Sequence, residues 1–174
     1  SYSWPLAVPL RRSQYQVVAS KFFEATFTSE DKRAYEFESE EFLFTGDTLF
    51  SAGVGRFFEG NAKDMLGNFK KLVPLNNGVH IFNGHEYTRQ NLEWASKVGP
   101  DNQDLQEYYE LSKVKACTLP STIAHEKRVN VFLRVLNPSP TLSKFGSEAE
   151  ELLKELRQMK NENRTTVSPP SSAL

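Results

Sequence analysis

The chain has few of the side chains that bind metals or form disulfides. Its 174 residues include one cysteine, Cys117, and three histidines, His80, His85 and His125. A single cysteine excludes an intrachain disulfide framework and a zinc site built from several thiolates, and it suits a reducing compartment. Because Cys117 has no histidine or basic residue directly beside it to activate the thiol, we expect a buried structural side chain rather than a nucleophile.

Long apolar runs and an excess of either charge are also missing. Lysine and arginine number 21 against 22 aspartates and glutamates, which gives a net charge of −1. This balance provides no global field to attract nucleic acid or an anionic membrane. No stretch approaches the roughly 20 apolar residues of a membrane span. With 39% hydrophobic residues, we expect a domain with a real core, no direct nucleic-acid partner and no transmembrane segment.

The two ends of the chain differ in composition from its middle. Residues 1–23 contain no acidic side chain and carry Arg11, Arg12 and Lys21, which is reminiscent of an organelle transit segment. We expect that the chain has been processed or trimmed before its first serine. We expect its location to be the mitochondrion or the cytoplasm. Residues 1–14 predict an extended lead-in. Residues 165–174, which include Pro169 and Pro170, predict a disordered tail.

Short strand-like segments dominate the first part of the chain. Residues 15–19, 22–28 and 41–45 are rich in aromatic and β-branched side chains, which favours strands. The charged residues 29–40 separate the last two, as expected for a hairpin or meander. Residues 79–83 predict one further strand, so the polypeptide is expected to build a sheet before it becomes helical.

Apolar residues at helical spacing predict helices at residues 61–72, 88–98 and 101–115, and a last helix after residue 147. Asn61 is the expected N-cap of the first helix. Gly99 and Pro100 end the second helix and mark a plausible domain boundary. Ser147 and Glu150 predict a capping box at the last helix. Residues 118–140 predict an irregular segment.

Two short phrases place polar side chains at the ends of predicted strands. Asp47 follows one strand and His85 follows the next, and ligands of layered α/β folds gather at such positions. A turn-capping aspartate and a hydrogen-bonded histidine would show the same pattern. The phrases are Phe44-Thr45-Gly46-Asp47-Thr48-Leu49-Phe50 and Asn83-Gly84-His85-Glu86-Tyr87-Thr88, with Gly55-Arg56-Phe57-Phe58-Glu59-Gly60 between them.

Together these phrases resemble glyoxalase II, the hydroxyacylglutathione hydrolase of the metallo-β-lactamase superfamily. The resemblance implies an α+β fold, with half of a metallo-β-lactamase αββα sandwich over residues 15–98 and a helical C-terminal domain over residues 99–164. The first half of such a sandwich has no counterpart here. One apolar sheet face would then be open, and we expect a protein partner to cover it.

The resemblance also implies metal ligands that the sequence largely lacks. Asp47 matches the aspartate that bridges two metals in the family, and His85 matches a ligand of the second metal. The main metal-binding phrase, Thr-His-x-His-x-Asp-His, is absent, and a gapless count back from Asp47 places Phe23 where the family has another histidine. A hydrolytic zinc needs about three protein ligands, so Asp47 and His85 form a vestigial site. We expect no cofactor, with zinc or iron only if other ligands come from elsewhere.

The side chains that hold glutathione in the family are better represented. By resemblance, the substrate-binding positions are Arg56, Phe58, Tyr87, Arg157 and Lys160. Arg157 and Lys160 lie three residues apart on the last predicted helix, so they share a face that can hold a carboxylate or simply face solvent. Phe58 replaces a tyrosine and removes one hydroxyl group. Loss of one hydrogen bond lowers affinity by about tenfold at most.

Three hypotheses for function follow. The first is a degenerate glyoxalase II-like protein that serves as a non-catalytic structural or binding subunit of a larger assembly. The second is a thioester hydrolase of S-lactoylglutathione whose remaining ligands lie elsewhere, with Asp47 and His85 as its catalytic residues. The third is a glutathione-conjugate binding module. Phe23 disfavours the second hypothesis, because a phenyl ring cannot bind a metal.

Overall fold

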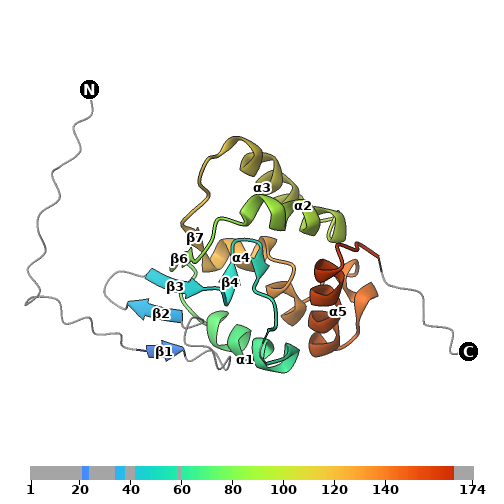
Figure 1. The fold of residues 1–174 in the computed structure, drawn as a ribbon, viewed down its shortest axis with the longest axis horizontal. Helices are drawn as coiled ribbons and strands as arrows, with labels where there is room; N and C mark the ends of the chain where they lie inside the picture. Colours follow the sequence, from blue (N-terminus) through green and yellow to red (C-terminus); the bar gives the residue numbers. More distant parts are fainter. Residues whose placement is uncertain (1–20, 24–33, 38–41, 59, 167–174) are drawn as a thin grey trace, which may run out of the picture.

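The computed structural model describes residues 21–23, 34–37, 42–58 and 60–166, and for the first two of these segments the backbone alone. Within these residues the fold is mixed α+β, as predicted (Figure 1). The strands are β1 (Lys21–Phe23), β2 (Ala34–Phe37), β3 (Phe42–Gly46), β4 (Leu49–Phe50), β5 (Gly53–Val54), β6 (His80–Asn83) and β7 (Ser121–Thr122). The helices are α1 (Ala62–Leu72), α2 (Thr88–Val98), α3 (Gln103–Val114), α4 (Ile123–Val129) and α5 (Ala149–Asn161), with 3-10 turns η2 (Leu133–Leu136) and η3 (Leu142–Phe145).

The main sheet has the strand order β1-β2-β3-β6-β7. β3 and β6 are parallel, and the other neighbouring pairs are antiparallel. The expected charged connection at residues 29–40 is wrong in part, because β2 lies inside it and pairs with both β1 and β3. The alternation Ala34-Tyr35-Glu36-Phe37 is a strand pattern that the surrounding charges obscured.

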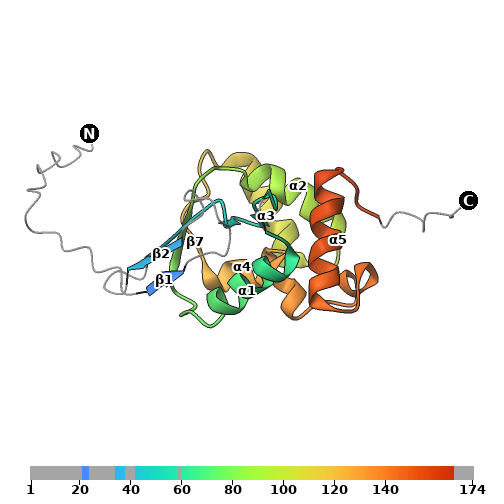
Figure 2. The ribbon, with the colours of Figure 1, turned by 60° about the horizontal axis from the view of Figure 1, so that its bottom comes forward.

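The two faces of this sheet have different surroundings. Leu43 and Ile81 are partners across β3 and β6, and both are fully buried. The neighbouring positions point to the opposite face, where Phe44 is 43% exposed and stacks on Phe82 with ring centroids 5.3 Å apart. Phe42 lies against both Phe82 and His80 on the same face. Figure 2 shows the helices gathered on one side of the strands.

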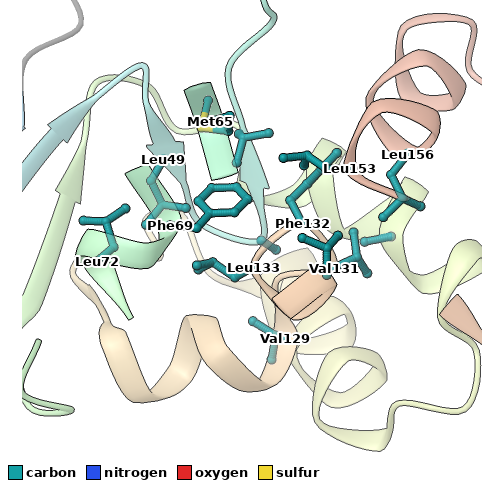
Figure 3. Packing of buried hydrophobic residues seen from close by; sticks show 14 of the residues in the cluster. Leu49, Met65, Phe69, Leu72, Val129, Val131, Phe132, Leu133, Leu153 and Leu156 are labelled. Atoms are coloured by element: carbon teal, nitrogen blue, oxygen red, sulfur yellow. The ribbon is translucent and has the colours of Figure 1, made fainter. Parts of the chain in front are cut away.

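The buried core lies where the β4–β5 hairpin, α1, α4, η2 and α5 meet (Figure 3). Its central side chains include Leu49, Phe69, Phe132 and Leu153, all fully buried. Helix α1 begins at the predicted N-cap, Asn61, whose side chain accepts hydrogen bonds from the amides of Lys63 and Asp64. The apolar side chains that repeat at helical spacing on α1 therefore face this core, as predicted.

Helices α2 and α3 also form where predicted, and α2 ends at Gly99. The expected irregular segment at residues 118–140 is wrong, because it contains β7, α4 and η2. Thr122 caps α4 by accepting a hydrogen bond from the amide of His125 at 3.1 Å. A seven-residue helix is too short to show clear periodicity in the sequence.

Two further predictions are wrong. Helix α5 begins at Ala149, and the carbonyl of Glu148 accepts its first hydrogen bond from Leu152 at 2.9 Å, so Ser147 precedes the cap and forms no capping box. Cys117 is exposed rather than buried, because it lies in the connection between α3 and β7. No helix among the described residues is both long and apolar enough to cross a membrane.

Other predictions lie outside the described residues. These are the lead-in at residues 1–14, the strand at residues 15–19, most of the strand at residues 22–28, and the tail from residue 167 onward. The division into a partial metallo-β-lactamase domain and a helical domain at residue 99 remains a prediction.

Candidate functional site

The aspartate at the end of β3 is held in a tight turn. The sheet register shifts between Phe44 and Gly46, and Gly46 has a φ of 48°, a backbone conformation that glycine adopts without strain. Gly84 donates its amide to the carbonyl of Gly46 at 3.0 Å. A Cβ atom on Gly84 would lie 2.9 Å from Oδ1 of Asp47, so glycine at this position leaves room for the carboxylate.

His85 follows the end of β6, the parallel neighbour of β3, and lies close to Asp47. Its Nε2 atom lies 3.6 Å from Oδ1 of Asp47, and both side chains are about half exposed. The imidazole stacks on the ring of Tyr87, with centroids 5.0 Å apart, and Phe50 packs against both rings. The parallel pairing of β3 and β6 thus brings together two side chains that are 38 positions apart in the sequence.

Glu86 fixes the loop that carries His85 and Tyr87. Its carboxylate accepts hydrogen bonds from the amide of Thr118 at 2.9 Å, the hydroxyl of Thr118 at 2.8 Å and the hydroxyl of Thr88 at 2.5 Å. Burial alone would raise the pKa of Glu86, but these donors together hold it below its ordinary value. The charged carboxylate therefore ties the start of α2 to the loop before β7.

A cavity of about 460 Å³ opens beside Asp47. It is lined by residues of the β3–β4 turn, the β4–β5 hairpin and its continuation, the start of α2, and α5. The lining residues are Asp47, Phe50, Val54, Gly55, Arg56, Phe58, Tyr87, Gln90, Asn91, Arg157 and Lys160. One carboxylate and three cationic side chains thus share a space large enough for a small peptide-like ligand.

The two α5 cations are anchored by neutral oxygen atoms. Arg157 is 95% buried, since 5% of its surface is exposed, and its Nη1 donates to the carbonyl of Val54 at 3.0 Å. Lys160 donates to the side-chain oxygen of Asn91 and lies 5.6 Å from the ring centroid of Trp94. Burial lowers the pKa of Arg157 to about 10, with Arg56 adding repulsion. Burial and the nearby Arg157 lower the pKa of Lys160 to about 7.

Comparison with known proteins gives this geometry a context. A family model described as hydroxyacylglutathione hydrolase C-terminus matches residues 86–163. The chain is 42% identical over 134 residues to a hydroxyacylglutathione hydrolase of Bartonella tribocorum, an alignment that covers 74% of this chain and 53% of the relative. Proteins of the same name from Klebsiella pneumoniae and Synechococcus are 43% identical over 114 residues and 39% identical over 133 residues. These alignments cover 63% and 74% of this chain, and 45% and 53% of the two relatives.

The chain resembles the C-terminal part of glyoxalase II. The resemblance predicted from the sequence is therefore confirmed. The chain spans about half the length of the curated relatives it matches. The activity of a whole glyoxalase II is accordingly a proposal for this chain rather than a property already established.

The donor set does not fit the two-metal centre that the glyoxalase II resemblance implies. Among the described residues, no three His, Cys, Asp or Glu side chains converge on one point. His80 lies edge-on to Phe42, and His125 packs against Tyr108 with centroids 4.3 Å apart. On the glyoxalase II pattern, Asp47 and His85 would supply two of the ligands of such a centre, and this role remains a prediction. Phe23 belongs to β1, and its side chain is not among those described.

The structure brings the remaining predicted positions into one place. Arg56, Phe58, Tyr87, Arg157 and Lys160 all line the cavity, together with Asp47, and His85 lies beside it through its contact with Tyr87. The sequence did not indicate Phe50, Val54, Gln90 or Asn91 as lining residues. Gln90 and Asn91 follow Tyr87 within one helical turn, and this spacing was the available signal.

Proposed function

We propose that the cavity binds a glutathione-like ligand and that this chain alone does not hydrolyse it. The observation that carries the proposal is the convergence of Arg56, Arg157 and Lys160 in one cavity of a chain similar to hydroxyacylglutathione hydrolases. Glutathione carries two carboxylates and one ammonium group. Guanidinium and ammonium side chains are the partners that carboxylates favour, and the single carboxylate of Asp47 lies at the same cavity.

The chemistry of the cavity supports a peptide-like ligand. Arg157 and Lys160 are held by Val54 and Asn91 through neutral oxygen atoms, so no carboxylate in these contacts competes with an incoming one. Tyr87 and Phe50 add an aromatic wall beside these cations. Phe58 lacks the hydroxyl of the family tyrosine, and its absence costs at most about tenfold in affinity. Binding is therefore expected to survive without the metal centre.

The proposal extends to a non-catalytic subunit within a larger assembly. The outer face of the main sheet carries Phe42, Phe44 and Phe82, and Phe44 is 43% exposed. We propose that this face belongs to half of a metallo-β-lactamase sandwich, residues 15–98, with the helical domain at residues 99–164 and a protein partner over the aromatic rings. Contiguous exposed apolar surface favours such a partner.

Hydrolysis of an S-acylglutathione is the second candidate. The observation that favours it is the 3.6 Å separation of Asp47 and His85 at the cavity. Under this proposal another polypeptide, or residues of a longer chain outside this sequence, supply the missing zinc or iron ligands. The chain then contributes these two side chains and the binding cavity. Phe23 stands against it, because the family places a histidine there.

Calorimetric titration with glutathione and S-hexylglutathione tests the binding proposal. The wild-type chain is expected to bind both, Arg56→Ala to weaken binding by up to about tenfold, and Arg89→Ala to leave it unchanged. Arg89 is the matched control because it is exposed at the start of α2 and does not line this cavity. Absence of saturable binding by the wild type, or equal weakening in both variants, would reject the proposal.

A turnover assay tests whether this chain hydrolyses the thioester without ligands from elsewhere. The purified chain is incubated with S-lactoylglutathione in the presence of zinc or iron, and its metal content is determined by elemental mass spectrometry. No hydrolysis and substoichiometric metal are expected of the chain alone. Hydrolysis by the chain alone, with about two metals bound, would overturn the non-catalytic proposal and would mean that residues of this chain complete the metal site.

A further inference from the structure

The β4–β5 hairpin is held by side chains from the helices. The peptide groups of five residues in a row, Phe50 to Val54, each take part in such a contact. Asn130 Nδ2 donates to the carbonyls of Phe50 at 3.3 Å and Gly53 at 3.1 Å, and Asn91 Nδ2 donates to the carbonyl of Ser51 at 3.0 Å. The amide of Ala52 donates to Glu126 Oε2 at 2.9 Å, and Arg157 Nη1 donates to the carbonyl of Val54 at 3.0 Å.

These contacts replace the support that a longer sheet would provide. β4 and β5 pair through two residues each and form a sheet of their own. The hairpin is nevertheless buried, and Ala52 has a φ of 55°, in the left-handed region. Buried backbone groups need hydrogen-bond partners. The hairpin therefore depends on the helices to keep its position as a wall of the cavity.

The holding side chains fall into two groups. Asn91 and Arg157 line the cavity, and Asn91 also accepts from Lys160. A carboxylate that binds Arg157 or Lys160 competes with these contacts. Glu126 and Asn130 do not line the cavity, and they lie one turn apart at the end of α4. Asn130 Nδ2 also donates to Glu126 Oε2 at 3.0 Å, so the two side chains act as one unit.

We propose that Glu126 and Asn130 are positioning residues that hold the β4–β5 hairpin as a cavity wall whether or not a ligand occupies Arg157 and Lys160. The inference rests on the proposed function in so far as the cavity binds a ligand. The support that the two side chains give to the hairpin does not depend on ligand binding. The pair sets the place of Phe50, Val54 and Arg56 relative to α5, and thereby the shape of the site.

Substitutions at the pair and beside it separate positioning from general support of the fold. Asn130→Ala removes the donor to two hairpin carbonyls. Glu126→Gln keeps one oxygen toward Ala52 and Asn130 and turns an amide toward Ser121, so it is the conservative variant. Ser121→Ala is the control, because Ser121 Oγ donates to Glu126 Oε1 at 2.5 Å without touching the hairpin.

Amide hydrogen exchange by mass spectrometry gives the first readout. In ligand-free wild type, the amides of residues 49–55 are expected to exchange slowly, like those of α4. Asn130→Ala is expected to increase the exchange rate of the hairpin amides by about tenfold or more, while the amides of α5 keep their protection. Glu126→Gln and Ser121→Ala are expected to stay close to wild type. Rapid exchange of the hairpin amides in ligand-free wild type would overturn the proposal. This measurement does not require any variant to fold.

Titration with S-hexylglutathione gives the second readout. Asn130→Ala is expected to bind about tenfold more weakly at an unchanged number of sites, and Glu126→Gln to bind within about threefold of wild type. Equal affinity in Asn130→Ala and wild type would overturn the positioning role. A wild type that does not bind would reject the proposed function, while the exchange data would still decide whether the pair holds the hairpin.

Discussion

Lys160 on α5 donates a hydrogen bond to the side-chain oxygen of Asn91 on α2, across 69 positions of the sequence. Asn91 in turn donates to the carbonyl of Ser51 in the hairpin. No carboxylate takes part in this chain of contacts. The ammonium group is therefore placed in a half-buried position against a neutral acceptor, which explains why its charged form is disfavoured.

This arrangement predicts that anion binding is coupled to proton uptake. The pKa of Lys160 is lowered to about 7 by burial and by Arg157. Arg56, Asp47 and Tyr87 face the same cavity. A ligand carboxylate favours the charged form and raises this pKa. The affinity for glutathione is therefore expected to be highest below pH 7 and to fall above it, by at most about tenfold per pH unit.

Titration calorimetry in two buffers of different ionisation enthalpy measures the protons taken up at pH 8. Lys160→Arg is the control, because a guanidinium stays charged throughout this range. Its affinity should be nearly constant between pH 7 and pH 9. A wild-type affinity that is equally constant, with no proton uptake, would contradict the prediction.

The sequence predicted the parts of the site that depend on neighbouring residues. Asp47, His85 and Tyr87 lie directly at strand ends, and the pairing of β3 with β6 brings them together. The Asn61 cap and the stripe on α1 were likewise local signals. Arg157 and Lys160 were found through the resemblance, because an Arg-x-x-Lys pair on a helix usually faces solvent.

Long-range polar contacts could not be predicted from the sequence. Asn91, Glu126 and Asn130 look like ordinary surface residues in the sequence, yet each is buried and holds the hairpin. Their partners are backbone groups that carry no sequence signature. The exposure of Cys117 was missed for a similar reason, since the connection after α3 lies at the surface. The burial or exposure of these side chains depends on the tertiary structure, and residue type alone does not indicate it.

The buried carboxyl of Glu126 predicts a pH-dependent stability. Burial raises the pKa of Glu126 above the ordinary value of 4.5, despite hydrogen bonds from Ser121, Ala52 and Asn130. The folded state therefore holds this proton more tightly than the unfolded state. Its contribution to the free energy of unfolding is present below pH 4.5 and is lost as the pH rises through the folded pKa. Wild type should lose stability over this interval.

Urea denaturation of wild type and Glu126→Gln at several pH values tests this expectation. The glutamine carries no titrating proton, so the stability of the variant relative to wild type should increase with pH from 4.5 upward. Glu150→Gln, at an exposed position in the first turn of α5, is the control. A constant difference between Glu126→Gln and wild type across the interval would refute the prediction.

Gly55 is predicted to be essential to the turn at Asp47. A Cβ atom on Gly55 would lie 2.2 Å from the carbonyl oxygen of Asp47, a distance that neither backbone can accept without moving. Gly55→Ala should lower the free energy of unfolding by about 1–3 kcal/mol and weaken glutathione binding. Gly67→Ala is the matched control. Its Cβ would meet nothing within 4 Å inside helix α1, so it should stabilise the chain by about 0.5–1 kcal/mol. Thermal denaturation that ranks the two variants the other way would contradict the geometry.

Phe58→Tyr is predicted to strengthen ligand binding. Phe58 lines the cavity and is 77% exposed, so a hydroxyl at the para position has room and remains accessible to a ligand. One added hydrogen bond contributes about 0.5–1.5 kcal/mol, or up to about tenfold in Kd. Phe57→Tyr is the control, because Phe57 is the adjacent ring and packs partly against the core. Calorimetry with glutathione should show tighter binding for Phe58→Tyr alone. Equal Kd values for Phe58→Tyr and wild type would mean that the ligand does not reach this side of the cavity, and would place it nearer to Arg157 and Lys160.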